Sequence, residues 1–176
     1  MRNKIIRKIF QIAAVLVCFL LQTTLFQELS FVSVSPNLLI VVTAAFGFMR
    51  GEREGMFVGF LSGLLIDLFF GEILGFYALI YLLAGFCNGV FKRIFYPDDV
   101  KLPIFLIAVS DLSCNLLIYF FWFLFRLRLQ IGYYLIHVLI PELVYTMIAA
   151  ILLYVILLKI NQKLEEIEKR SAKKFV

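Results

Sequence analysis

Charged residues are scarce in this chain: only 16% of its 176 residues are Asp, Glu, Lys or Arg, whereas 63% are hydrophobic. A soluble domain is nearer to about half apolar and about a quarter charged. The mean hydropathy of +0.99 lies far from that balance. The composition therefore excludes an ordinary soluble domain and indicates an integral membrane protein.

Cysteine and histidine are also rare. The three cysteines, Cys18, Cys87 and Cys114, lie in apolar stretches with no CxxC pair and no histidine nearby, so we interpret each as a small buried hydrophobe. His137, the one histidine, and Glu142 are five residues apart and point about 140° away from each other on a helix, which does not make a metal pair. We predict no catalytic residue, no cofactor and no metal.

Long apolar runs are abundant, and a spanning helix needs about 20 mainly apolar residues. Six segments approach that length: 9–26, 32–49, 55–70, 75–95, 102–125 and 133–158. The first is interpreted as an uncleaved anchor, because no small-residue cleavage site follows its apolar core. The sequence predicts an all-α integral membrane protein, with a compact bundle of six transmembrane helices over residues 1–158 and a charged tail over 159–176.

The basic residues predict the orientation of the bundle. All Lys and Arg residues except Arg126 and Arg128 fall in the two termini or in the loops that share their side of the membrane. Because cytoplasmic segments are enriched in Lys and Arg, both termini are expected in the cytoplasm. A basic rim of this kind meets anionic lipid, so the bilayer is a predicted partner and nucleic acid is not.

Glycines recur every four residues through one part of the chain, and three of them, Gly55, Gly59 and Gly63, share a predicted helix with Asp67. Small residues at this spacing let a second helix approach closely in lipid. We expect the strip to pack against another helix of this chain or against the single span of a partner. Asp67 lies at the rotated outer end of the strip, where a different neighbour is expected.

Three carboxylates, Asp67, Asp111 and Glu142, lie inside predicted spans, where an acid is costly unless it has a partner. The rise per residue predicts that Asp67 and Glu142 share an outer-half cavity, with Asp111 nearer mid-depth. This offset in depth disfavours an intramembrane catalytic pair. Asp111 and Asn115 are four residues apart, so they can hydrogen-bond each other or bind one shared neighbour. We favour a role in hydrogen bonding between helices, and an ion or proton relay is the alternative. Pro141 predicts a bend beside Glu142.

The tail carries Ile160, Leu164 and Ile167 at helical spacing, between Glu and Lys or Arg pairs four residues apart. This pattern predicts that the last span continues into the cytoplasm as an amphipathic helix. Such a helix offers a contact surface to a cytoplasmic partner. A solvated tail is the alternative.

The order and spacing of several motifs resemble a known family. The second span begins near Pro36-Asn37-Leu38-Leu39. The third contains Gly55-x3-Gly59-x3-Gly63-Leu-Leu-Ile-Asp67-Leu and is followed by Gly75. This arrangement is similar to the MreD family of rod shape-determining proteins. The resemblance implies a non-enzymatic subunit of the bacterial inner membrane that works in cell-wall elongation with MreC, MreB, a glycosyltransferase and a transpeptidase.

The same resemblance implies a fold like that of the substrate-binding S components of energy-coupling-factor vitamin transporters. An S component is therefore one alternative function, and an ion-coupled membrane carrier is another. Outer polar groups are few, and the first span has Ala13 and Ala14 but no small residues at four-residue spacing for docking a transporter subunit. A small-molecule ligand is therefore not expected.

Overall fold

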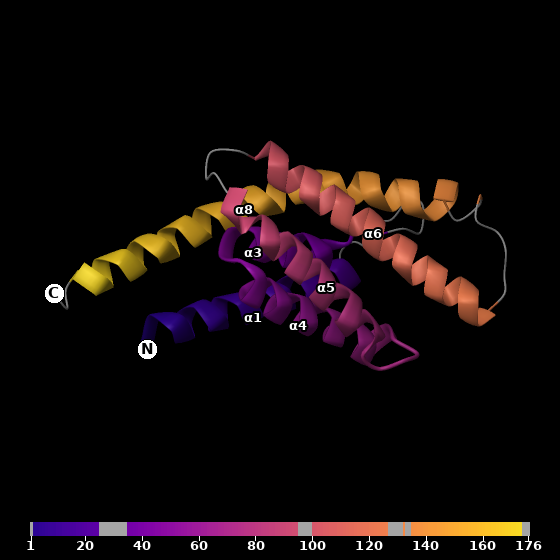
Figure 1. Ribbon diagram of the computed structural model, residues 1–176, viewed down its shortest axis with the longest axis horizontal. Helices are drawn as coiled ribbons and strands as arrows, with labels where there is room; N and C mark the ends of the chain where they lie inside the picture. The colour runs from indigo at the N-terminus through magenta and orange to yellow at the C-terminus, as the bar shows by residue number, and fades with distance from the viewer. Residues whose placement is uncertain (1, 25–34, 95–99, 127–131, 133–134, 174–176) are drawn as a thin grey trace.

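The computed structural model describes residues 2–24, 35–94, 100–126, 132 and 135–173. All regular structure in these ranges is helical, and each of the six predicted apolar segments overlaps one α-helix (Figure 1). The α-helices are α1 (Arg2–Thr23), α3 (Leu38–Arg50), α4 (Glu52–Phe70), α5 (Phe76–Val90), α6 (Lys101–Arg126) and α8 (Ile140–Lys173). A short 3-10 helix, η1 (Phe91–Ile94), follows α5, and a π-helical turn, η2 (Leu135–Leu139), precedes α8.

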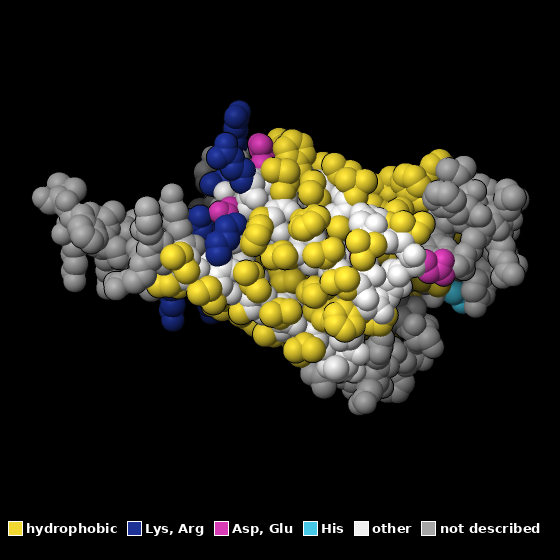
Figure 2. Space-filling view, turned by 90° about the horizontal axis from the view of Figure 1, so that it is seen from below, with side chains coloured by type: hydrophobic (Ala, Val, Ile, Leu, Met, Phe, Trp, Pro, Cys, Tyr) yellow, Lys and Arg dark blue, Asp and Glu magenta, His cyan; other side chains and the backbone are white. Residues whose placement is uncertain are grey.

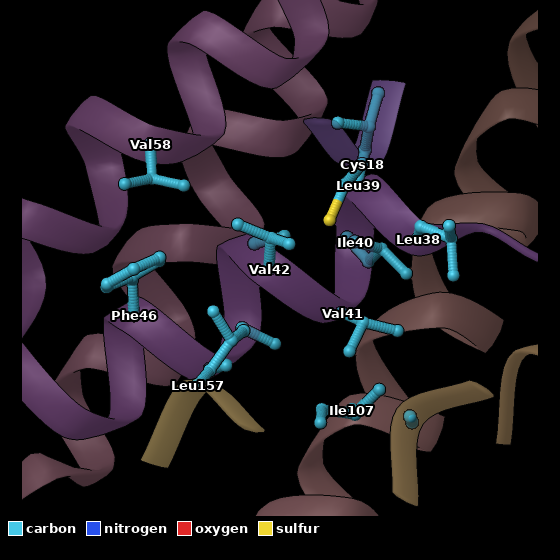
Figure 3. Packing of buried hydrophobic residues seen from close by; sticks show 14 of the residues in the cluster. Cys18, Leu38, Leu39, Ile40, Val41, Val42, Phe46, Val58, Ile107 and Leu157 are labelled. Atoms are coloured by element: carbon cyan, nitrogen blue, oxygen red, sulfur yellow. The ribbon is translucent and has the colours of Figure 1, made fainter. Parts of the chain in front are cut away.

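Helix α3 forms the centre of the molecule. Every residue from Leu38 to Met49 is buried, and α1, α4, α5, α6 and α8 all pack against this helix. A helix that is apolar on all sides lies either in a protein core or in lipid, and α3 lies in the core. Figure 3 shows the core around α3, to which four other helices contribute Cys18, Val58, Ile107 and Leu157.

Gly51 alone joins α3 to α4. Its φ of 99° lies in the left-handed region, which an L side chain rarely adopts, and its N–H donates to the Gly47 carbonyl at 2.7 Å. The chain therefore reverses without a loop. The first residues of α1 and the last of α8 lie on the same side of the bundle, and the end of α8 extends past the other helices (Figure 1).

Three helices are long and apolar enough to cross a membrane: Ile5–Thr23, Lys101–Phe121 and Ile136–Glu166. Only 22%, 22% and 28% of their most apolar windows are buried by the rest of the protein. The remaining apolar faces point outward, as lipid requires. Figure 2 shows apolar side chains over most of the described surface and Lys and Arg gathered toward one end. The chain is a membrane-embedded helical protein.

We call this end of the bundle, which carries Arg7, Lys8, Arg50, Arg53 and Lys92, the basic end. Helices α1, α4 and α6 start at the basic end, and α3, α5 and α8 run back toward it (Figure 1). We call the other end of the bundle the opposite end.

One local prediction was wrong. Cys87 is exposed on α5, whereas Cys18 and Cys114 are buried. In a lipid-embedded helix the outward positions are apolar too, so an apolar setting does not distinguish an inward from an outward cysteine. Pro141 is the second residue of α8 and directly follows the π-helical turn η2, so the helical hydrogen-bonding pattern changes beside Glu142. The bend itself stays a prediction.

Candidate functional site

Helices α4 and α5 are in direct backbone contact along the glycine strip. A Cβ atom added to Gly55, Gly59 or Gly63 would meet the carbonyl oxygen of Gly85, Tyr81 or Tyr77, respectively, closer than real Cβ atoms approach. The contact is reciprocal, because a Cβ on Gly85 would meet the Gly55 carbonyl in the same way. Of the two neighbours expected for this strip, the structure places a helix of the same chain there. The strip is covered by α5.

Asp67 stands at the far end of this contact and is 3% exposed. Its Oδ2 accepts hydrogen bonds from the backbone N–H groups of Gly75 (3.0 Å) and Ala78 (2.9 Å), and its Oδ1 accepts one from Tyr77 (2.9 Å). These donors are the N-cap residue Gly75 and two residues of the first turn of α5, where N–H groups lack intrahelical acceptors and a negative charge is favoured. Asp67 therefore caps α5 and meets the same helix as the glycines, not a different neighbour.

The other two predicted carboxylates come together between α6 and α8. The Nδ2 of Asn115 lies 3.4 Å from Oδ1 of Asp111 and 3.3 Å from Oε1 of Glu142. One amide thus bridges two acids. The prediction that Asp67 and Glu142 share one cavity was wrong: both Asp67 oxygens are bonded to α5, and only Glu142, which lies beside Asn115, lines a cavity at the opposite end. The rise per residue gives the depth of a side chain along its own helix. It does not give the direction in which that side chain points, so two residues at the same depth need not face each other.

A second layer of polar groups surrounds these acids. Asn37, at the start of α3, donates its backbone N–H to Thr146 Oγ1 at 3.0 Å and accepts the Tyr81 hydroxyl at its Oδ1 at 2.8 Å. The side chains of Asn37 and Thr146 lie near the Asp111 carboxylate. Sequence reasoning noted Asn37 but missed Thr146 and Tyr81. Threonine and tyrosine are common in apolar helices, so neither residue type carried a signal.

A cavity of about 380 Å³ opens beside this network at the opposite end of the bundle. Its walls come from all six α-helices and from η2. The polar lining residues are Gln22, Thr23, Ser35, Asn37, Tyr77, Tyr81, Asn115 and Glu142, and the apolar ones are Phe19, Leu39, Ile66, Phe70, Ile118 and Val138. Within the described ranges this lining has one carboxylate, that of Glu142, and no Lys, Arg or His.

At the basic end, Glu54 ties α1 to α4. Its carboxylate accepts hydrogen bonds from Arg7 Nη2 at 2.9 Å, Lys8 Nζ at 2.8 Å and Gln11 Nε2 at 2.8 Å. Glu54 precedes the predicted span of residues 55–70. Burial acts to raise the pKa of this carboxyl, but the hydrogen bonds and the two positive charges outweigh burial and lower the pKa below its ordinary 4.5.

Arg50 ties α3 to the tail of α8. Its Nε donates to the Asn161 side chain, and its Nη1 lies 3.8 Å from the Glu165 carboxylate. Of the predicted tail contacts, Ile160 and Leu164 are half-buried, and the side chain of Ile167 lies outside the described residues. The start of the tail is thus attached to the bundle through polar contacts that the apolar pattern did not reveal.

Residues 3–164 match a family model described as rod shape-determining protein MreD. No curated protein and no solved structure matches the chain.

Replacing Gly59 by Leu is expected to force α4 and α5 apart, since the added side chain would overlap the Tyr81 carbonyl. Overpacking of this kind costs about 1–3 kcal/mol. The melting temperature of the detergent-purified protein and its accumulation in membranes should both fall. Gly132→Leu is the matched control, because a Cβ there meets nothing within 4 Å. Equal melting temperatures for the two variants would show that the backbone contact is incidental.

Asp67→Asn is expected to uncap α5. Asparagine has one acceptor oxygen where the carboxylate uses two, so at least one of the three N–H groups is left buried and unpaired, at about 1–3 kcal/mol. Hydrogen–deuterium exchange should accelerate at residues 75–78 and stay unchanged in α3. Unchanged exchange at residues 75–78 would mean that the cap does not hold the start of α5.

The lowered pKa of Glu54 predicts a pH dependence of stability. A carboxyl whose folded pKa is depressed stabilises the fold above its unfolded pKa, and this contribution is lost as pH falls through the folded pKa. Wild-type protein should therefore lose stability below about pH 4.5 more steeply than Glu54→Gln. Glu52→Gln, at an exposed neighbouring position, should keep the wild-type slope. Parallel curves for wild type and Glu54→Gln would contradict the assignment.

Proposed function

The chain belongs to the MreD family of rod shape-determining proteins, and from this premise we propose that it is a non-enzymatic subunit of the bacterial cell-wall elongation complex. It binds partner membrane proteins such as MreC and helps to organise lateral peptidoglycan synthesis. MreB, a glycosyltransferase and a transpeptidase are the other members of that assembly. The observation that carries the proposal is the family match over residues 3–164, which includes the cavity, the glycine contact and the start of the tail.

In this proposal α1, α3, α4, α5, α6 and α8 are six spans of the inner membrane, in a fold like that of an S component. The basic end and both termini face the cytoplasm. The concentration of Lys and Arg at one end supports this orientation. Helix α3 has 13 residues, about 20 Å, which is shorter than the hydrocarbon core of about 30 Å. Five other helices surround it, so lipid does not have to match its length.

The packing restricts where a partner span can bind. Because α5 covers Gly55, Gly59 and Gly63, the single span of MreC packs elsewhere in this proposal, on the exposed apolar faces of α1, α6 or α8. The tail supplies a second contact. Residues Ile160, Leu164 and Ile167 continue α8 into the cytoplasm, where a soluble partner reaches them.

One observation favours the alternative of a small-molecule-binding S component. The cavity of about 380 Å³ has the size of a ligand pocket and lies at the end where an S component takes its substrate. Partner proteins separate these two functions, since an S component associates with transporter ATPase subunits and an elongation subunit associates with MreC.

Affinity-tagged protein, extracted from its own host in mild detergent, should co-purify MreC. An unrelated six-span protein that carries the same tag, purified in the same way, is the control and should not. Cells that lack the protein should lose their rod shape, and the wild-type gene should restore their length-to-width ratio. Recovery of transporter ATPases without MreC, from cells that stay rod-shaped, would instead establish the transporter function.

A further inference from the structure

The cavity at the opposite end has the dimensions of a small-molecule site. Ligand pockets in proteins measure about 300–1,000 Å³, and this cavity measures about 380 Å³. Its walls combine aromatic side chains, among them Phe19, Tyr77 and Tyr81, with the amide of Asn115 and the carboxylate of Glu142. Neither the glycine contact nor the proposed binding of MreC uses this space.

Two acids lie at or behind the inner wall of the cavity: Glu142 lines it, and Asp111 lies behind Asn115. The Asn115 amide is shared between Asp111 and Glu142, and the Tyr81 hydroxyl is already bonded to Asn37. Asp111 is fully buried, with the side chains of Asn37 and Thr146 near its carboxylate, and its Oδ2 makes no direct hydrogen bond of ordinary geometry to a described residue. Two acids inside a membrane bundle are costly unless a positive charge or protons compensate them.

The shape and lining of the site select among cations. A divalent metal ion prefers six or more oxygen ligands close around it, and the described residues contain no group of three His, Cys, Asp or Glu side chains that converge. The space is also far larger than a bare ion. Aromatic rings attract organic cations through their π-faces, and ammonium groups donate hydrogen bonds to carboxylates.

We propose that this cavity binds a small organic ammonium group, which donates to Glu142 while Asn115 holds Asp111 behind it and Tyr77, Tyr81 and Phe19 surround the carbon atoms. The ammonium group comes either from a free amine or from the head group of an aminophospholipid. The proposal rests on the cavity and its acids, and it is independent of the function proposed above.

Ethanolamine is the probe for the free amine, and ethylene glycol is its neutral counterpart of similar size. Ethanolamine should raise the melting temperature of the detergent-purified full-length protein in a saturable way, and ethylene glycol should not. Equal shifts with the two compounds, or an equal shift with sodium chloride at matched concentration, would overturn the assignment to an ammonium group.

The lipid source is tested by native mass spectrometry after extraction from nanodiscs made of phosphatidylethanolamine or of phosphatidylglycerol. Retention of phosphatidylethanolamine alone would identify the head group as the source, and a response to ethanolamine alone would identify a free amine. Absence of both responses would overturn the proposal.

Glu142→Gln should weaken either interaction at least tenfold. Glu166→Gln, which removes an exposed carboxylate of the same helix outside the cavity, should not. If Glu142→Gln fails to fold, the comparison of ethanolamine with ethylene glycol on wild-type protein still decides the question. Unchanged affinity in a folded Glu142→Gln variant would contradict the proposal.

Discussion

The backbone contact between α4 and α5 is the constraint on which the rest of the structure depends. Lipid supplies no hydrophobic drive between helices, so two helices adhere by close packing and by hydrogen bonds. Gly55, Gly59 and Gly63 allow that packing, and the carboxylate of Asp67 fixes the start of α5 at its end. Gly51 reverses the chain between α3 and α4, so α3 packs against the α4–α5 pair. Helices α1, α6 and α8 pack against α3 from its other sides.

The charged side chains at the two ends of the bundle have different kinds of partner. At the basic end Glu54 receives three side-chain donors, and Arg50 reaches a carboxylate and an amide on α8, so these charges are matched within the protein. At the opposite end Asp111 and Glu142 share one amide donor beside an open cavity. The acids at the opposite end have amide and hydroxyl partners but no Lys or Arg among the described residues of the cavity lining, and this difference is the basis for the proposed ammonium site.

Much of the architecture could be predicted from residues alone, where a local rule applied. Apolar runs predicted where the helices lie, and the spacing of four predicted that Gly55, Gly59 and Gly63 face a neighbouring helix. The spacing of Asp111 and Asn115 predicted their contact, since residues four apart lie on one face of a helix. Predictions of which side chains from different helices face each other were less accurate, because they depend on how each helix is rotated about its axis and on which helices lie next to it. The prediction that Asp67 and Glu142 share one cavity was wrong for this reason.

The sequence by itself determined the class of protein, the helical segments and the distribution of charge along the chain, because these follow from composition and from periodicity within single segments. Only the tertiary structure decided that α5 covers the glycine strip, that Asp67 is a helix cap, and that Glu142 joins Asn115 at a cavity. In lipid the inward and outward faces of a helix are both apolar. Hydrophobicity therefore does not identify which helix faces contact each other. Close packing and hydrogen bonds between residues distant in the sequence decide this.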